Sequence, residues 1–90
     1  MNVVLVDDEK SIRITLGDDI REAGHAVSVF ENGKTAYEYI KESGCDILIC
    51  DLKMPGMDGM ALLKTVKKQN PVMRVILITG YGTVENAVEA

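Results

Sequence analysis

The sequence contains no run of 18 apolar residues, and therefore no segment long enough to cross a bilayer as a helix. It also lacks the basic segment followed by a long apolar one with which secreted proteins begin, so we expect a cytoplasmic protein. Its 90 residues allow at most one small domain. Because 47% of them are hydrophobic and 27% charged, that domain can bury a core and does not have a disordered composition.

Basic residues are too few and too dispersed for a nucleic-acid surface. The formal net charge is −4, and the local concentration of lysine at Lys64, Lys67 and Lys68 is best explained as the solvated face of one helix. We therefore expect no direct nucleic-acid contact by this domain. If the protein acts on DNA, another domain should bind it.

Cysteine and histidine are also scarce. On one extended segment, the Cα atoms of Cys45 and Cys50 would lie roughly 16 Å apart, whereas a disulfide needs less than about 7 Å. We expect free thiols, with Cys50 in the core, and no third or fourth soft ligand is near enough to complete a metal site. The single histidine, His25, follows Gly24 and is expected to be a surface turn residue rather than a catalyst.

Short apolar runs alternate with stretches of helical spacing along the whole chain. The runs cover residues 3–6, 26–30, 47–50 and 75–78. Helical spacing of apolar residues predicts helices around residues 12–23, 36–40 and 62–66, and a fourth helix beginning at Thr83. This alternation predicts an α/β fold with a parallel sheet and right-handed crossovers.

The second apolar run indicates the order of the strands. Ser28 lies between Val27 and Val29, and this partial alternation favours an edge strand, whereas the other runs are continuous and indicate strands covered on both faces. An edge second strand gives the order 2-1-3-4, with strands 1 and 3 at the centre. This is the beginning of the flavodoxin-like doubly wound order.

Acidic residues follow both central strands. Asp7 and Asp8 come directly after the first strand, Asp51 after the third, and Thr79 ends the fourth. In such sheets ligands bind at the carboxyl ends of the strands, at the point where the strand order reverses. Three ionised carboxylates there need a cation or raised pKa values, and an oxygen-only cluster suits Mg²⁺. Because Mg²⁺ often works together with a phosphate group, the cluster indicates phosphoryl transfer, with one aspartate as candidate nucleophile.

Purely structural roles are the alternative explanation for these acids. Aspartates after strands commonly cap helices or form turns, and Asp8 or Glu9 could cap the first helix, as Asp58 could form the turn before the third. For any single aspartate this explanation is preferred. The convergence of Asp7, Asp8 and Asp51 at one point favours a site.

The motifs "VLVDDE", "DILICDLKMPGMDG" and "VILITG", in this order, resemble the receiver domain of bacterial two-component response regulators, and the resemblance covers all 90 residues. It implies that Asp51 accepts a phosphoryl group from a histidine kinase, with Mg²⁺ as cofactor. It implies that Asp8 is a direct Mg²⁺ ligand, that Asp7 assists, often through water, and that Lys53 supplies a backbone carbonyl ligand. Thr79 matches the hydroxyl that turns toward the phosphoryl oxygens and switches the region after the fourth strand.

The family domain is longer than this chain. It continues with the rest of the fourth helix, a fifth strand with an aromatic switch residue and a terminal lysine, and a fifth helix, all of which would follow Ala90. We therefore expect a receiver domain over residues 1–90 that is truncated within its fourth helix and leaves the fourth strand at an exposed edge. The chain would be a fragment of a longer protein, or a partner chain would complete it, and a homodimer is left open.

The segment "ILITGYGTVENAVEA" resembles receivers of transcription activators that carry an ATPase domain and a DNA-binding domain further along the chain. The leading hypothesis is thus a signalling protein, not an enzyme in its own right, that regulates transcription. An interaction module of the same fold that works without phosphorylation is the alternative. A Mg²⁺-dependent phosphatase with Asp51 as nucleophile is disfavoured, because that class usually has a second acid where this chain has Lys53.

Overall fold

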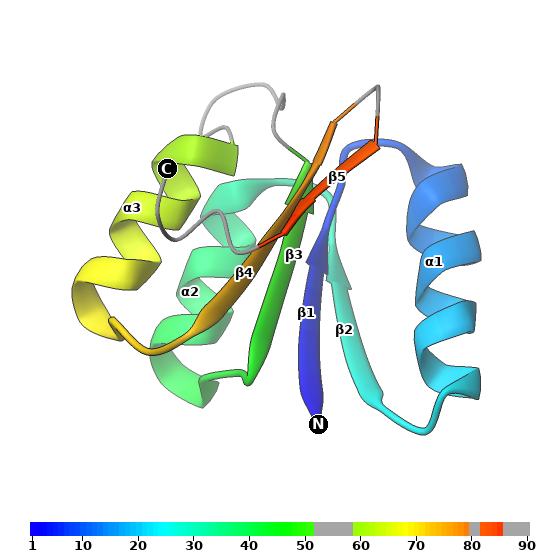
Figure 1. Cartoon of the computed structure of the whole chain (residues 1–90), viewed down its shortest axis with the longest axis horizontal. Helices are drawn as coiled ribbons and strands as arrows, with labels where there is room; N and C mark the ends of the chain where they lie inside the picture. Colours follow the sequence, from blue (N-terminus) through cyan, green and yellow to red (C-terminus); the bar gives the residue numbers. More distant parts are fainter. Residues whose placement is uncertain (52–58, 80–81, 86–90) are drawn as a thin grey trace.

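The computed structural model describes residues 1–51, 59–79 and 82–85. Strands and helices alternate along these residues (Figure 1). The strands are β1 (Asn2–Val6), β2 (Ala26–Phe30), β3 (Ile47–Asp51), β4 (Arg74–Thr79) and β5 (Gly82–Glu85). The helices are α1 (Lys10–Glu22), α2 (Gly33–Ser43) and α3 (Gly59–Gln69).

The strands form one sheet in the order β2-β1-β3-β4-β5. β1 pairs in parallel with both β2 and β3, and β3 pairs in parallel with β4. The predicted order 2-1-3-4 and the edge position of the second strand are therefore confirmed. The carboxyl ends of β1 and β3 lie side by side, since Val6 is in register with Cys50.

The main hydrophobic core lies between the sheet and the helices α2 and α3, which cover the same face (Figure 1). The sheet contributes alternate residues of its central strands to this face, as the two-residue period of a strand requires. They are Val4, Val6, Leu48, Cys50, Val75 and Leu77. The helix α3 contributes Leu62, Leu63 and Val66, which share one face by helical spacing and are buried in this core.

Local capping explains the bounds of α2. The Asn32 side chain accepts a hydrogen bond from the Thr35 N–H at 2.9 Å, which satisfies one of the donors left free at a helix start. The helix ends before Gly44, whose φ of 71° is a conformation that glycine adopts at little cost. A glycine after a helical pattern is a common stop signal, and α2 ends there.

The opposite face of the sheet is covered by α1, which packs against β2 and β1 (Figure 1). Gly17 is buried on this helix, and a Cβ added there would lie 3.5 Å from a methyl group of Val29 in β2. α1 therefore lies directly against β2 at this position, where an added methyl group would make only an ordinary van der Waals contact. Ile12, whose helical spacing with Leu16 and Ile20 predicts an inward position, is 36% exposed.

The C-terminal part of the described chain differs from the prediction. The sequence predicts a helix from Thr83, but Gly82–Glu85 form β5, which pairs antiparallel with β4. The predicted helix start is wrong, and so is the expectation that β4 lies at an exposed edge. The backbone groups of that edge gain partners from β5, and the β-branched Thr83 and Val84 suit a strand. Residues 86–90 lie outside the described residues.

The cysteines behave as predicted. Cys50 is fully buried, and neither cysteine forms a disulfide. Desolvation, together with the nearby charge of Asp46, raises the pKa of Cys45 to about 11, so this thiol stays protonated at neutral pH. His25 lies half-exposed in the turn between α1 and β2. Of the helices that the structure describes, none has the length and apolarity to span a membrane.

Candidate functional site

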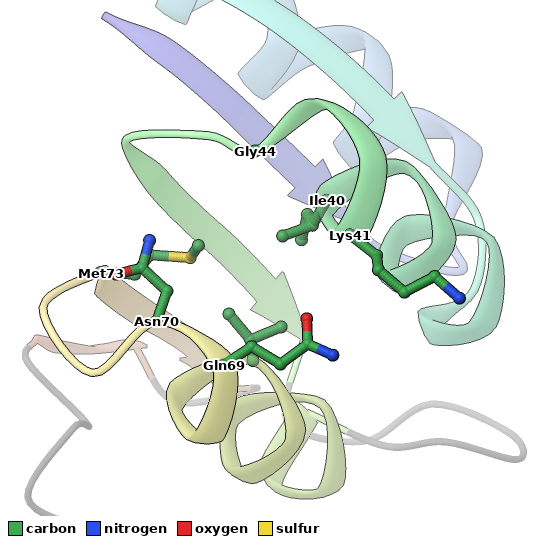
Figure 2. A pocket seen from close by; sticks show the side chains of 7 residues that line it. Ile40, Lys41, Gly44, Gln69, Asn70 and Met73 are labelled. Atoms are coloured by element: carbon green, nitrogen blue, oxygen red, sulfur yellow. The ribbon is translucent and has the colours of Figure 1, made fainter.

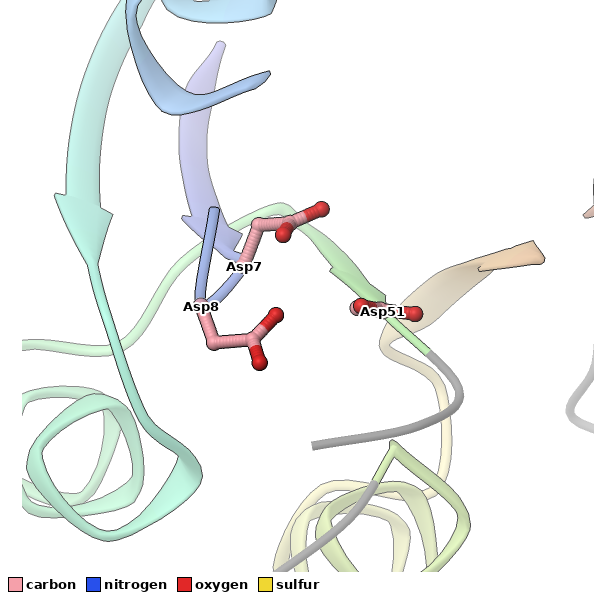
Figure 3. Close-up of side chains that lie close together, drawn as sticks. All are labelled: Asp7, Asp8 and Asp51. Atoms are coloured by element: carbon pink, nitrogen blue, oxygen red, sulfur yellow. The ribbon is translucent and has the colours of Figure 1, made fainter. Parts of the chain in front are cut away.

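Three carboxylates converge at the carboxyl ends of β1 and β3. Asp7 and Asp8 follow the last residue of β1, and Asp51 is the last residue of β3. One oxygen of each carboxylate lies within 4.8 Å of the others. Figure 3 shows the side chains of Asp7 and Asp8 turned toward the end of β3 where Asp51 lies. The prediction that these acids meet at one point of the sheet is confirmed.

The three acids, hereafter the acidic triad, differ in exposure. Asp7 is buried, with 3% of its surface exposed, whereas Asp51 is half-buried and Asp8 exposed. The triad is therefore open to solvent on the side of Asp8 and closed on the side of Asp7.

Hydrogen bonds hold Asp7 on three sides. Its backbone N–H donates to the Phe30 carbonyl at the end of β2, at 3.1 Å. Its carboxylate Oδ1 accepts from the Glu9 N–H at 2.8 Å, which is the local turn that aspartate favours after a strand. Its backbone carbonyl accepts from Nη1 of Arg13 at 2.7 Å. An aspartate does form the turn before α1, but this aspartate is the buried Asp7.

The electrostatics of Asp7 reflect its burial. Desolvation raises the pKa of Asp7, the hydrogen bond from the Glu9 N–H lowers it, and the charges of Asp51, Asp8 and Glu9 raise it, with a net rise above 3.8. The carboxyl group is thus more easily protonated in the folded protein than in the unfolded chain. Ionised Asp7 therefore destabilises the fold when no cation is bound.

We predict that Asp7→Asn raises the melting temperature of the metal-free chain at pH 7. A group with a raised folded pKa gives stability below its unfolded pKa and loses it as the pH rises through the folded value. The variant keeps a neutral group at every pH, so its advantage over the parent should shrink on acidification and vanish below about 3.8. Thermal melts between pH 3.5 and 8 with a chelator test this, and an advantage that does not change with pH would contradict it.

The triad has the chemistry of a Mg²⁺ site. Mg²⁺ prefers carboxylate oxygens and water as ligands. One oxygen of each triad carboxylate lies within 4.8 Å of the others, so the three side chains can converge on one cation. The like charges that raise the pKa of Asp7 are the charges that such a cation neutralises. Asp7, Asp8 and Asp51 therefore fit this ion.

Of two further predicted site residues, the structure describes the backbone position of Thr79 and does not describe Lys53. Thr79 is the last residue of β4 and follows Ile78, which is in register with Asp51. The Thr79 backbone therefore lies at the same carboxyl end of the strands as the triad. The orientation of the Thr79 side chain lies outside what the structure describes. Lys53, predicted to offer a backbone carbonyl, lies outside the described residues, as does Asp58.

The sequence reasoning missed Arg13. This residue lies in the first turn of α1, and its contact with the Asp7 carbonyl joins the helix to the turn that carries two of the acids. The available signal was an arginine five positions after Asp8, where the first helical turn can direct a long side chain back over the helix start.

A separate pocket of about 230 Å³ lies between the C-terminal ends of α2 and α3 (Figure 2). Ile40, Val66 and Met73 line it, and Lys41 is the charged residue among its described lining side chains. The Lys41 ammonium lies 5.8 Å from the centre of the Tyr37 ring, and Figure 2 shows it directed away from the pocket. The pocket lies near the starts of β3 and β4, at the end of the strands opposite the triad, and its described lining residues include no carboxylate, so it is not the candidate site.

Comparisons with known proteins agree on one family. The family described as "Response regulator receiver domain" matches residues 3–90. The DNA-binding transcriptional regulator NtrC of Escherichia coli K12 is 41% identical over 88 residues, which are 98% of this chain and 19% of NtrC. The chain therefore spans about a fifth of the length of this relative.

Solved structures show the same fold. The response regulator TrrA from Thermotoga maritima, in complex with Mg²⁺ and BeF, superposes with a TM-score of 0.85 at 31% identity, covering 89% of this chain and 70% of TrrA. A chain of the complex between histidine kinase ThkA and TrrA gives a TM-score of 0.83 at 31% identity, covering 90% of this chain and 70% of the other. The parallel order 2-1-3-4 with its three helices is thus shared with known receiver structures.

Proposed function

Because this chain belongs to the response regulator receiver domain family, we propose that it is a phosphoacceptor signalling domain in which Asp51 receives a phosphoryl group from a histidine kinase. The observation that carries the proposal is the convergence of Asp7, Asp8 and Asp51 at the carboxyl ends of the two central strands. Asp51 is the acceptor within this triad because it ends a central strand and is half-buried, whereas Asp7 is buried and hydrogen-bonded on three sides.

The transfer is a direct displacement at phosphorus. A carboxylate oxygen of Asp51 forms the new bond to phosphorus, the bond from phosphorus to the imidazole nitrogen of the donor breaks, and its electron pair stays on that nitrogen. Asp7, Asp8 and Asp51 would hold Mg²⁺, with the Lys53 carbonyl as a further ligand. When bound, Mg²⁺ supplies positive charge beside the transferring phosphoryl group. The fixed position of Asp7 keeps the acids converged without reorganisation.

Thr79 is proposed as the residue that reads the phosphorylated state. Its hydroxyl would donate to a phosphoryl oxygen on Asp51, a strong acceptor that the unmodified domain does not present. That hydrogen bond would bias the segment after β4 toward a second arrangement. The position of Thr79 at the end of β4, beside the strand that ends in Asp51, supports this role.

The wider context is proposed from the relatives. The TrrA structure with ThkA is a complex of a response regulator with a histidine kinase, and the NtrC relative is a transcriptional regulator about five times as long as this chain. We infer a cytoplasmic signalling protein whose partners are a sensor histidine kinase and, in the full protein, an ATPase domain and a DNA-binding domain. This domain itself contacts neither DNA nor membrane, and a homodimer is compatible with this role.

The test is intact-protein mass spectrometry after incubation with acetyl phosphate, with Mg²⁺ or with a chelator. We expect a single phosphoryl adduct that requires Mg²⁺. Absence of an adduct at saturating Mg²⁺, both here and in a chain extended through the family's fifth strand, would contradict the proposal and favour an interaction module that works without phosphorylation. Repeated turnover of a generic phosphate ester would instead indicate a phosphatase.

A further inference from the structure

Arg13 connects helix α1 to the turn that carries two acids of the triad. It lies in the first turn of α1 and is half-buried. Its backbone N–H makes a helical hydrogen bond to the Glu9 carbonyl at 3.2 Å, while its side chain reaches back past the helix start. There Nη1 donates to the backbone carbonyl of Asp7 at 2.7 Å, the short distance typical of a charged donor.

The hydrogen bond from Arg13 to the Asp7 carbonyl also affects the position of Asp8. The carbonyl oxygen of Asp7 lies in one rigid plane with the nitrogen and Cα of Asp8, because the peptide bond is planar. The Asp7 nitrogen is already held by Phe30, and its carboxylate by Glu9. The contact with Arg13 adds a third hydrogen bond to this turn, on the peptide between Asp7 and Asp8, and further limits rotation of that peptide. The starting direction of the Asp8 side chain therefore depends on Arg13.

We propose that Arg13 is a positioning residue for the triad, which sets Asp8 in place for a divalent cation through the Asp7 carbonyl. The inference rests on the proposed function for the identity of the cation as Mg²⁺. Asp8 is the exposed member of the triad, so the rest of the protein constrains it least and the orientation of its backbone matters most. Outer contacts that orient metal ligands typically contribute about 10–100-fold to metal affinity.

The positive charge of Arg13 should affect Mg²⁺ affinity in the opposite direction from its hydrogen bond to the Asp7 carbonyl. A guanidinium beside the triad repels a divalent cation, so its removal by itself should tighten cation binding. Removal of the contact with the Asp7 carbonyl should weaken binding, because the turn is freed and a half-buried carbonyl loses its partner. The two roles of Arg13 therefore predict changes of opposite sign in the dissociation constant for Mg²⁺.

The experiment is titration of the full chain with Mg²⁺ by calorimetry, without any phosphodonor, for the parent, Arg13→Met and Arg13→Lys. We expect Arg13→Met to raise the Mg²⁺ Kd about tenfold and Arg13→Lys, which keeps the charge and one donor, to restore part of the loss. Arg21→Met is the matched control, since it removes the same charge from the exposed end of the same helix, where Arg21 pairs with Asp18. Its Kd should match the parent.

Amide hydrogen exchange of the metal-free proteins gives a second readout. The Glu9 N–H, which donates to Asp7, should exchange faster in Arg13→Met, whereas the amides of α2 and α3 should keep their parent rates. A Kd that is unchanged or lower in Arg13→Met, or unchanged exchange at Glu9, would overturn the positioning role. If Arg13→Met does not fold, the same two measurements are made on Arg13→Gln, which removes the charge and the Nη1 donor, and values equal to those of the parent would overturn the positioning role.

These outcomes separate the inference from the proposed function. A parent chain that binds Mg²⁺ but gains no adduct at Asp51 would contradict phosphoacceptance, while the Mg²⁺ titration still decides the role of Arg13. A parent chain that is phosphorylated, with Arg13→Met binding Mg²⁺ as tightly as the parent, would overturn the role of Arg13 alone. A parent chain with no measurable affinity for Mg²⁺ would contradict both.

Discussion

Asp51→Asn should abolish the phosphoryl adduct while the chain remains folded. The amide oxygen of asparagine is a poor nucleophile, so the displacement at phosphorus loses its attacking group. Asparagine has nearly the same shape as aspartate, and the core residues that anchor β3, Leu48 and Cys50, are not changed. The variant also removes one of the charges that raise the pKa of Asp7. Its metal-free melting temperature should therefore equal or exceed that of the parent.

Mass spectrometry with acetyl phosphate and circular dichroism on the same samples measure both parts of this prediction. Asp19→Asn is a matched control, because it makes the same chemical change on an exposed carboxylate of α1, far along the helix from the triad. The control should gain the adduct to the same extent as the parent. An adduct that persists in Asp51→Asn would place the acceptor elsewhere, and loss of the fold would mean that the Asp51 carboxylate is mainly structural.

The arrangement of the triad could be predicted from sequence because two rules of parallel sheets determine it. First, uninterrupted apolar runs indicate that β1 and β3 are central strands. Second, neighbouring parallel strands have their carboxyl ends at the same end of the sheet. Once the order 2-1-3-4 follows from the partial alternation at Ser28, Asp7 and Asp51 can only be neighbours. No knowledge of side-chain packing is needed for this step.

Other features depend on interactions that a local pattern does not contain. The pairing of β5 with β4 was missed because the helical spacing of Val84, Ala87 and Val88 is a local signal, whereas the unpaired edge of β4 is a property of the whole sheet. The contact of Arg13 with the Asp7 carbonyl was missed because side-chain hydrogen bonds to backbone leave no periodic trace. The functional roles of Thr79 and Lys53 come from resemblance, since spacing alone distinguishes neither residue from ordinary loop and strand positions.

Asp8→Ala should be more stable than the parent without metal and less stable than the parent with Mg²⁺. Without metal the variant should melt at a higher temperature than the parent, because the Asp8 charge is one of those that make ionised Asp7 unfavourable. With Mg²⁺ the parent gains stability by mass action, by about 2.7 kcal/mol when the free ion is at 100 times its Kd. Loss of a direct ligand should weaken binding at least about tenfold, since loss of an outer contact alone typically costs that much.

The melting temperatures of parent and variant, plotted against Mg²⁺ concentration, should therefore cross. This crossing identifies Asp8 as a metal ligand more specifically than a measurement in either condition alone. A merely structural Asp8 would make the variant less stable in both conditions, whereas an uninvolved exposed Asp8 would leave both unchanged. Asp19→Ala, an exposed aspartate of α1, controls for loss of one negative charge from a protein of net charge −4. A metal-free Asp8→Ala chain less stable than the parent would contradict the electrostatic account of the triad, because repulsion among its carboxylates would then not be the dominant force at this edge of the sheet.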